Sequence, residues 1–213
     1  MTNMRLVVIG GLFAAWSPAH ATVSYGPSEY LSAADSPWFA MTGLVLEDFE
    51  DGVFNIPGVT ASGGTVLAPG GSTDSVDGDD GAIDGSGTAG HSFYRIASDG
   101  ILFSFNAAML GRLPTHAGVV WTDGPSGGVI EFEAYDASGG LITRITGTHA
   151  DSDFHGTTAE DRFYGVEHDA GIASIFITSS GSMEVDHLQY IVPAPQAFGL
   201  LAAFGAVGVR RRR

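Results

Sequence analysis

The stretch that decides the fold is VIEFEAYDASGGLITRI, residues 129–145. Within residues 129–135 apolar side chains alternate with the carboxylates of Glu131 and Glu133, and this period of two is typical of a strand with one buried face. Residues 138–140, Ser-Gly-Gly, then supply the small residues of a tight turn before a second β-rich run. The stretch therefore predicts an antiparallel hairpin.

Other short β-rich runs lie on both sides of this hairpin, each bounded by Gly, Asp, Ser or Pro, as turns require. They are residues 101–105, 117–121 and 172–178, in addition to the second run of the hairpin, residues 141–145. No stretch of eleven residues in the body of the chain has the 3.6-residue period of an amphipathic helix. About eight short strands predict an all-β fold, an antiparallel β-sandwich of jelly-roll type.

In the last predicted strand the apolar side chains change parity, because Met183 and Val185 are followed by Leu188 and Tyr190. A slip of one residue moves side chains to the opposite face of a sheet. A β-bulge near residues 186–187 would restore the register and turn Asp186 and its neighbour outward together. The alternative is that both faces of the strand are buried here.

Composition limits the classes of function. The chain has 213 residues with 44% hydrophobic content, enough for one well-buried domain, and no cysteine, which excludes disulfides, thiolate metal sites and a cysteine nucleophile. Its 24 acids face 9 bases, all arginine, so a general nucleic-acid binder is excluded.

The first 21 residues have the pattern of a secretion signal. Arg5 precedes an apolar run over residues 6–16, and residues 19–21, Ala-His-Ala, fit a signal-peptidase site. We expect cleavage by signal peptidase, with Thr22 as the first mature residue. The alternative is a buried N-terminal helix.

The C-terminus has an equally ordered pattern. Val192, Pro193, Ala194 and Pro195 precede an apolar run over residues 197–209, and Arg210, Arg211, Arg212 and Arg213 end the chain. The run contains no polar residue, so it predicts a hydrophobic helix suited to lipid, with its tail held on the cytoplasmic side. The alternative is a terminal core helix with a basic tail.

Residues 192–213 resemble the PEP-CTERM sorting signal of exported proteins of Gram-negative bacteria, with Ala194 where the usual motif has glutamate. The resemblance implies an exosortase as processing partner and the membrane as a transient partner of the C-terminal segment. It places the mature protein at the cell surface or in the extracellular matrix.

Between the two signals, residues 22–43 read as a lead-in segment and residues 44–191 as the β-sandwich domain. Several short motifs resemble a recurrent, uncharacterised extracellular domain of proteins that bear this sorting signal. They lie in residues 75–85, 113–118, 121–124, 158–166 and 184–190. That resemblance implies export and a β-sandwich and assigns no site residue. Four arginines against 24 acids give this body a formal charge of −20, which attracts divalent cations.

Two acidic stretches predict a calcium site. Asp77, Asp79 and Asp84 are interleaved with glycines, which let the backbone turn sharply around a hard cation. Since the first and last strands of jelly rolls are often neighbours, Glu47 could approach Asp186 and complete a structural ion site. The alternatives are a solvated Gly/Asp loop and unpaired surface carboxylates.

Two pairs of residues are candidates for ligand binding. Trp121 with Asp123, and Tyr164 with Arg162, would stack on a sugar ring and bind its hydroxyls if they lie at the rim of the sandwich. An extracellular polysaccharide is then the expected partner. The alternatives are core packing for Trp121 and an ion pair with a surface acid for Arg162.

A catalytic interpretation rests on Glu131 and Glu133, about 7 Å apart on one strand face, as an acid/base pair of a glycoside hydrolase. Simple alternation gives the same pattern on any solvated face, and no metalloprotease or nucleophile-elbow motif occurs. The expected function is therefore that of an exported surface or matrix protein, structural or adhesive and not an enzyme. A calcium-stabilised carbohydrate-binding module is the alternative, and a hydrolase is third.

Overall fold

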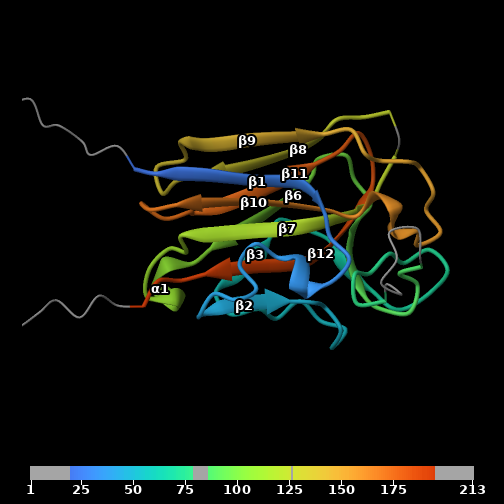
Figure 1. The fold of residues 1–213 in the computed structure, drawn as a ribbon, viewed down its shortest axis with the longest axis horizontal. Coiled ribbons are helices and arrows are strands. Elements are labelled where there is room, and N and C mark those ends of the chain that lie inside the picture. The colour runs from blue at the N-terminus through green and yellow to red at the C-terminus, as the bar shows by residue number, and fades with distance from the viewer. Residues whose placement is uncertain (1–19, 79–85, 126, 195–213) are drawn as a thin grey trace, which may run out of the picture.

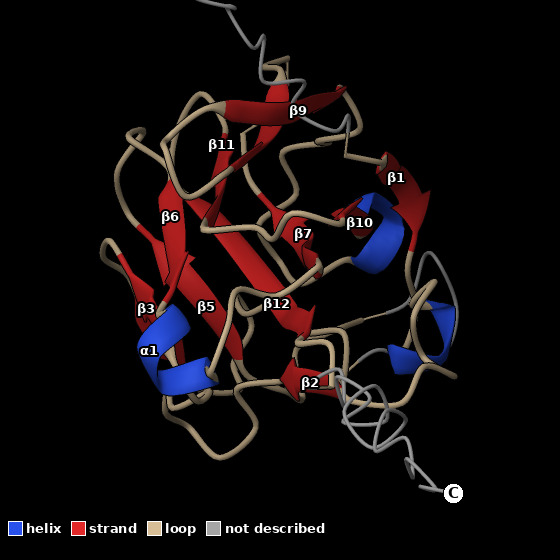
Figure 2. Ribbon diagram, turned by 90° about the vertical axis from the view of Figure 1, so that its left-hand side faces the viewer, coloured by secondary structure: helices blue, strands red, loops and turns tan. Residues whose placement is uncertain are grey.

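The computed structural model describes residues 20–78, 86–125 and 127–194, and their fold is almost entirely antiparallel β-structure in two packed sheets (Figures 1 and 2). The expected signal helix and C-terminal hydrophobic helix lie outside these residues. None of the helices within the described ranges has the length and apolar character needed to cross a membrane.

The elements follow one another with short connections. In chain order they are β1 (Thr22–Glu29), η1 (Ala33–Asp35), β2 (Leu44–Glu47), β3 (Val59–Ala61), β4 (Thr65–Leu67), β5 (Ser92–Arg95), β6 (Ile101–Phe105), α1 (Ala107–Leu110), β7 (His116–Asp123), β8 (Ile130–Tyr135), β9 (Leu141–Gly147), η2 (Thr158–Glu160), β10 (Arg162–His168), β11 (Ser174–Thr178) and β12 (Met183–Ile191).

The larger sheet has the order β1-β10-β7-β12-β5-β4, with β2 also paired to β12, and the smaller sheet has the order β3-β6-β11-β8-β9. From β5 to β12 the chain crosses from one sheet to the other at every step except β8 to β9 and keeps the strand orders 5-12-7-10 and 6-11-8-9. These orders are those of a jelly roll, so the predicted sandwich is confirmed. In Figure 1, β1 begins and β12 ends at the left, and the longer loops gather at the right.

The main core lies between the sheets and is built by alternation, as the hairpin sequence predicts. Ile130, Phe132 and Ala134 on β8 point into it and are buried, while Glu131 and Glu133 point away. The hairpin closes where the Asp136 and Gly140 backbones pair and Gly139 takes φ +80°. The predicted turn at residues 138–140 is confirmed.

The expected lead-in, residues 22–43, is instead part of the sandwich. β1 pairs with β10 along the edge of the larger sheet, and Tyr30 and Trp38 are buried against Phe163 on its outer face, in a second core. The sequence conceals this because β1 is mostly exposed and shows no apolar alternation. Backbone pairing and two buried rings hold the segment, and neither leaves a periodic pattern.

The predicted bulge in β12 is confirmed. The register against β7 shifts between Asp186 and Gln189, and His187 has φ +45°. Val185 and Leu188 consequently both point into the main core. Asp186 and His187 turn together toward the outer face, where they are buried beneath neighbouring segments.

Candidate metal centre and ligand pocket

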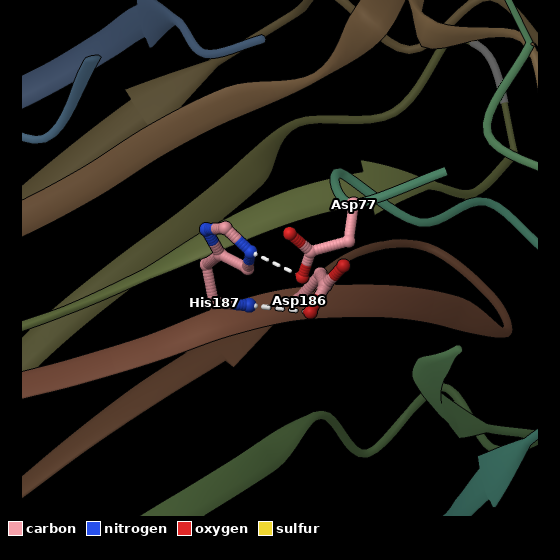
Figure 3. A group of neighbouring side chains, drawn as sticks. All are labelled: Asp77, Asp186 and His187. Atoms are coloured by element: carbon pink, nitrogen blue, oxygen red, sulfur yellow. Dashed lines mark hydrogen bonds and ion pairs between the residues drawn. The ribbon is translucent and has the colours of Figure 1, made fainter. Parts of the chain in front are cut away.

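Asp77, Asp186 and His187 form the one compact group of potential metal ligands found among the described residues. One ligand atom from each lies within 4.8 Å of the other two, and Figure 3 shows the three side chains converging from a loop and from β12. Asp186 and His187 are buried and Asp77 is exposed, so the group is open on one side.

Short contacts between the loop and β12 assemble this group. The backbone N–H of Val76 donates to Asp186 Oδ2 at 2.8 Å, which holds the loop against the bulge. Asp77 Oδ2 lies 2.9 Å from His187 Nε2, and the hydroxyl of Tyr30 lies 3.1 Å from Nδ1 of the same ring. The Tyr30 contact fixes the orientation of the imidazole, as outer-shell partners do in metal sites.

The charges of the group are strongly coupled. Burial raises the pKa of Asp186 to about 7. Burial alone would lower the pKa of His187, but the carboxylates of Asp186 and Asp77 outweigh it and raise that pKa. The cluster therefore favours a positive charge between the carboxylates, supplied by the imidazolium or by a bound cation. One imidazole and two carboxylates suit zinc or a similar transition metal better than calcium, which takes oxygen ligands.

Of the residues predicted to bind calcium, Asp77 and Asp186 come together, while Asp79 and Asp84 lie outside the described residues. Glu47 does not join them, although β2 does pair with β12 as the first-and-last-strand argument requires. Its carboxylate accepts backbone N–H groups of Phe49, Asn55 and Ile56 at 2.7–3.2 Å. The prediction for Glu47 is therefore wrong, because the side chain organises its own loop.

A pocket of about 460 Å³ opens at the end of the sandwich where the longer loops gather. The rings of Tyr94 and Phe154 form part of its wall, together with Pro125, and the carboxyl groups of Asp123 and Glu184 also line it. A pocket that combines apolar walls with a few polar groups in this size range is typical of small-ligand sites.

Further carboxyl groups lie next to the pocket. Glu184 Oε2 accepts from the hydroxyl of Ser92 at 2.5 Å and from the backbone of Asp74 at 3.0 Å, while burial raises the pKa of Glu184 to about 7. Asp123 is hydrogen-bonded to the side chain of Glu160. Burial and the neighbouring carboxylates raise the pKa of Glu160 to about 9, so this group carries a proton at neutral pH.

Of the four predicted ligand-binding residues, only Asp123 lines this pocket. Trp121 is buried in the main core with its ring 5.1 Å from that of His149, and Tyr164 is buried with its hydroxyl 2.7 Å from His149 Nε2. Arg162 donates to backbone carbonyls of Ala159 and Asp161. Trp121 and Tyr164 are core residues, which corrects the expectation of a stacking role.

Tyr94 and Phe154, the aromatic residues that do line the pocket, were not predicted as site residues. Tyr94 belongs to a four-residue strand, and Phe154 lies in a loop without periodicity. The two residues line the same pocket because the jelly roll brings β5 next to a loop that lies about 60 residues later in the sequence. The sequence signal for Phe154 is an aromatic residue that directly follows an acidic stretch, with Asp151 and Asp153 before it.

Glu131 and Glu133 lie on the outer face of the smaller sheet, where one guanidinium, that of Arg144, forms ion pairs with both. Burial would raise the pKa of Glu133, but the hydrogen bond from Tyr135 and the charge of Arg144 outweigh it and lower that pKa. A glycosidase acid needs a raised pKa. The geometry of this pair therefore does not support the hydrolase interpretation.

No protein-family model matches the chain, and no curated protein matches it. Among solved structures, the K1 cleaved adhesin domain of Lys-gingipain from Porphyromonas gingivalis W83 is 14% identical, with a TM-score of 0.42, covering 71% of this chain and 99% of that domain. The xylan-binding domain of CBM 22 is 15% identical, with a TM-score of 0.34, covering 71% of this chain and 96% of that domain. Both likenesses are distant.

Proposed function

We propose that this chain is an exported binding protein of the bacterial cell surface or extracellular matrix, with an adhesive role carried by the pocket at the loop end of the jelly roll. The observation that supports this most is the pocket itself, in which Tyr94 and Phe154 stand beside the carboxyl groups of Asp123 and Glu184. It offers both an apolar surface and polar groups that orient a ligand.

The proposal of export rests on the two chain ends. Residues 1–21 have the order of a secretion signal, and residues 192–213 have the order of a PEP-CTERM sorting signal, with Val192-Pro193-Ala194-Pro195 before the apolar run and the terminal arginines. An exosortase and the membrane are the partners that this tail would meet. The strongly acidic body between the signals suits a soluble exported domain.

Removing residues 192–213 tests the sorting step. Cells that produce the full chain or the truncated chain are fractionated, and each fraction is probed for the protein. We expect the full chain at the surface or in the matrix and the truncated chain in the periplasm. The same distribution for both would contradict sorting through the tail, and it would leave the binding role of the domain untouched.

The adhesive role is tested by the attachment of the purified domain to isolated matrix polysaccharide. The double variant Tyr94→Ala/Phe154→Ala removes the aromatic wall of the pocket, while Phe39→Ala removes an equally exposed ring elsewhere. We expect the double variant to lose attachment and Phe39→Ala to keep it. Equal attachment of both variants would refute the pocket as the adhesive site.

A second candidate function is a metal-stabilised carbohydrate-binding module, favoured by the convergence of Asp77, Asp186 and His187. In this proposal the cation fastens the acidic loop to β12 and so stiffens the loop end of the sandwich. Its role would be structural, since the group is separate from the residues that line the pocket.

A further inference from the structure

Two carboxyl groups face each other across the pocket end of the larger sheet. Asp123 on β7 and Glu184 on β12 are directly opposite in the strand register, and both line the pocket. Their residues are only 8% and 3% exposed. Like charges at opposite positions of paired strands destabilise a sheet, and burial increases the cost. A cationic group placed between the two carboxylates would relieve this repulsion.

The residues around the pocket add negative charge. Burial raises the pKa of Asp123, and the charges of Asp151 and Asp153 in the neighbouring loop add to this effect. No arginine or histidine is among the described residues that line the pocket. Two of the arginines of the body are engaged elsewhere, Arg95 with Asp99 and Arg144 with the glutamates of β8.

The hydrogen bonds that hold Glu184 are all from neutral donors. Ser92 and the backbone of Asp74 both donate to one oxygen, Oε2, so they hold the carboxyl group in one orientation. Asp123 is oriented by the Gly124 backbone and by the side chain of Glu160. Both carboxyl groups are therefore preorganised, which lowers the entropic cost of binding a cationic group.

The walls of the pocket define the rest of the ligand. Phe154 is 60% exposed and, with Tyr94 and Pro125, provides apolar surface beside the acids. Aromatic faces attract both the C–H face of a sugar ring and a nearby ammonium group. The volume of about 460 Å³ accommodates a small ring-sized ligand and exceeds what a bare metal ion needs.

We infer that this pocket binds a protonated amino sugar, with the ammonium group between Asp123 and Glu184 and the sugar ring against Tyr94 and Phe154. The inference rests on the proposed binding function and names its ligand class. A neutral sugar would give the two carboxyl groups no cationic partner, and a simple cation would leave the aromatic side chains of the pocket without a contact. An amino sugar satisfies both parts of the pocket.

Isothermal titration with short glucosamine oligomers at pH 7 tests the inference, with the fully N-acetylated oligomers of the same length as the uncharged comparison. We expect the glucosamine oligomer to bind at least about tenfold more tightly, with an affinity that falls as salt is added. Glu184→Gln and Asp123→Asn should each weaken binding about tenfold or more. Asp169→Asn, which removes one exposed acid outside the pocket, should leave it unchanged.

Equal binding of the acetylated and free oligomers would overturn the inference, as would unchanged affinity in Glu184→Gln. Calcium chloride titrated alone is the third arm, and calcium binding that Glu184→Gln abolishes would reassign the pocket to a metal ion. Thermal melts of each variant show whether it remains folded. If no glucosamine oligomer binds while the domain still attaches to matrix polysaccharide through Tyr94 and Phe154, the ligand class is wrong and the proposed function stands.

Discussion

The imidazole Nε2 of His187 lies 2.9 Å from Oδ2 of Asp77, across 110 residues of sequence. This contact joins the last strand of the jelly roll to the acidic, glycine-rich loop. The bulge in β12 makes it possible, because a regular strand would turn His187 toward the main core.

Zinc should stabilise the protein through this group. At about one hundred times the dissociation constant, a ligand specific for the native state adds about 2.7 kcal/mol, which is roughly 5–10 °C in Tm for a domain of this size. Differential scanning fluorimetry with zinc, with calcium and with chelator measures the shift. Asp77→Asn and His187→Gln should each abolish it, and a Tm that is the same in all three conditions would count against a bound cation.

Glu47→Ala should destabilise the fold rather than impair binding. Its carboxylate satisfies three backbone N–H groups, those of Phe49, Asn55 and Ile56, and its loss leaves buried donors without an acceptor. We expect a loss of about 3 kcal/mol in urea unfolding. Glu29→Ala removes a glutamate whose side chain is largely exposed and should cost less than about 0.5 kcal/mol.

Trp121→Ala should cost about 3–5 kcal/mol of folding stability, because the indole is fully buried in the main core. Trp121→Phe keeps most of that packing, so it should retain attachment to polysaccharide. The measurements are urea unfolding and the attachment assay on the same preparations. Loss of attachment in a stably folded Trp121→Phe protein would restore Trp121 as a binding residue.

Stability should fall as the pH rises above neutral. The Glu160 carboxyl has a pKa of about 9 in the folded protein against an ordinary value of 4.5, so the native state holds a proton that the unfolded chain releases. Its contribution is complete below pH 4.5 and is lost as the pH rises through about 9. Within that window the unfolding free energy should decrease by up to about 1.4 kcal/mol per pH unit.

Urea unfolding at pH 7.5 and pH 8.5 measures this dependence, and the matched variant Glu160→Gln removes the proton while keeping the shape of the side chain. We expect a clearly smaller decrease in the variant. Glu184 and Asp186, with pKa values of about 7, contribute mainly below this range. Identical slopes for the two proteins would show that Glu160 is already ionised in the folded state.

The fold was predictable because the alternation in β8 and the parity change in β12 are local consequences of burying one face of a strand. The site was only partly predictable. Asp77 and Asp186 could be predicted because each lies in an acidic stretch of sequence. His187 joins them only because of the bulge, and the carboxylate of Glu47 instead accepts hydrogen bonds from the backbone of its own loop. The prediction of a binding role for Trp121 was wrong because an aromatic residue at the end of a strand gives the same sequence pattern in the core and at the rim of a sandwich.

The jelly roll also sets which way the pocket faces. Thr22 pairs with His168, whose N–H donates to Thr115, and the N–H of Thr115 donates to Ile191, so the first and last strands leave the domain at one pole. β7 begins at His116, which pairs with Ile191, and ends at Asp123, so Asp123 lies at the opposite end of the same sheet. If the protein were anchored to a surface through either terminus, the pocket would therefore lie at the end of the domain farthest from the anchor.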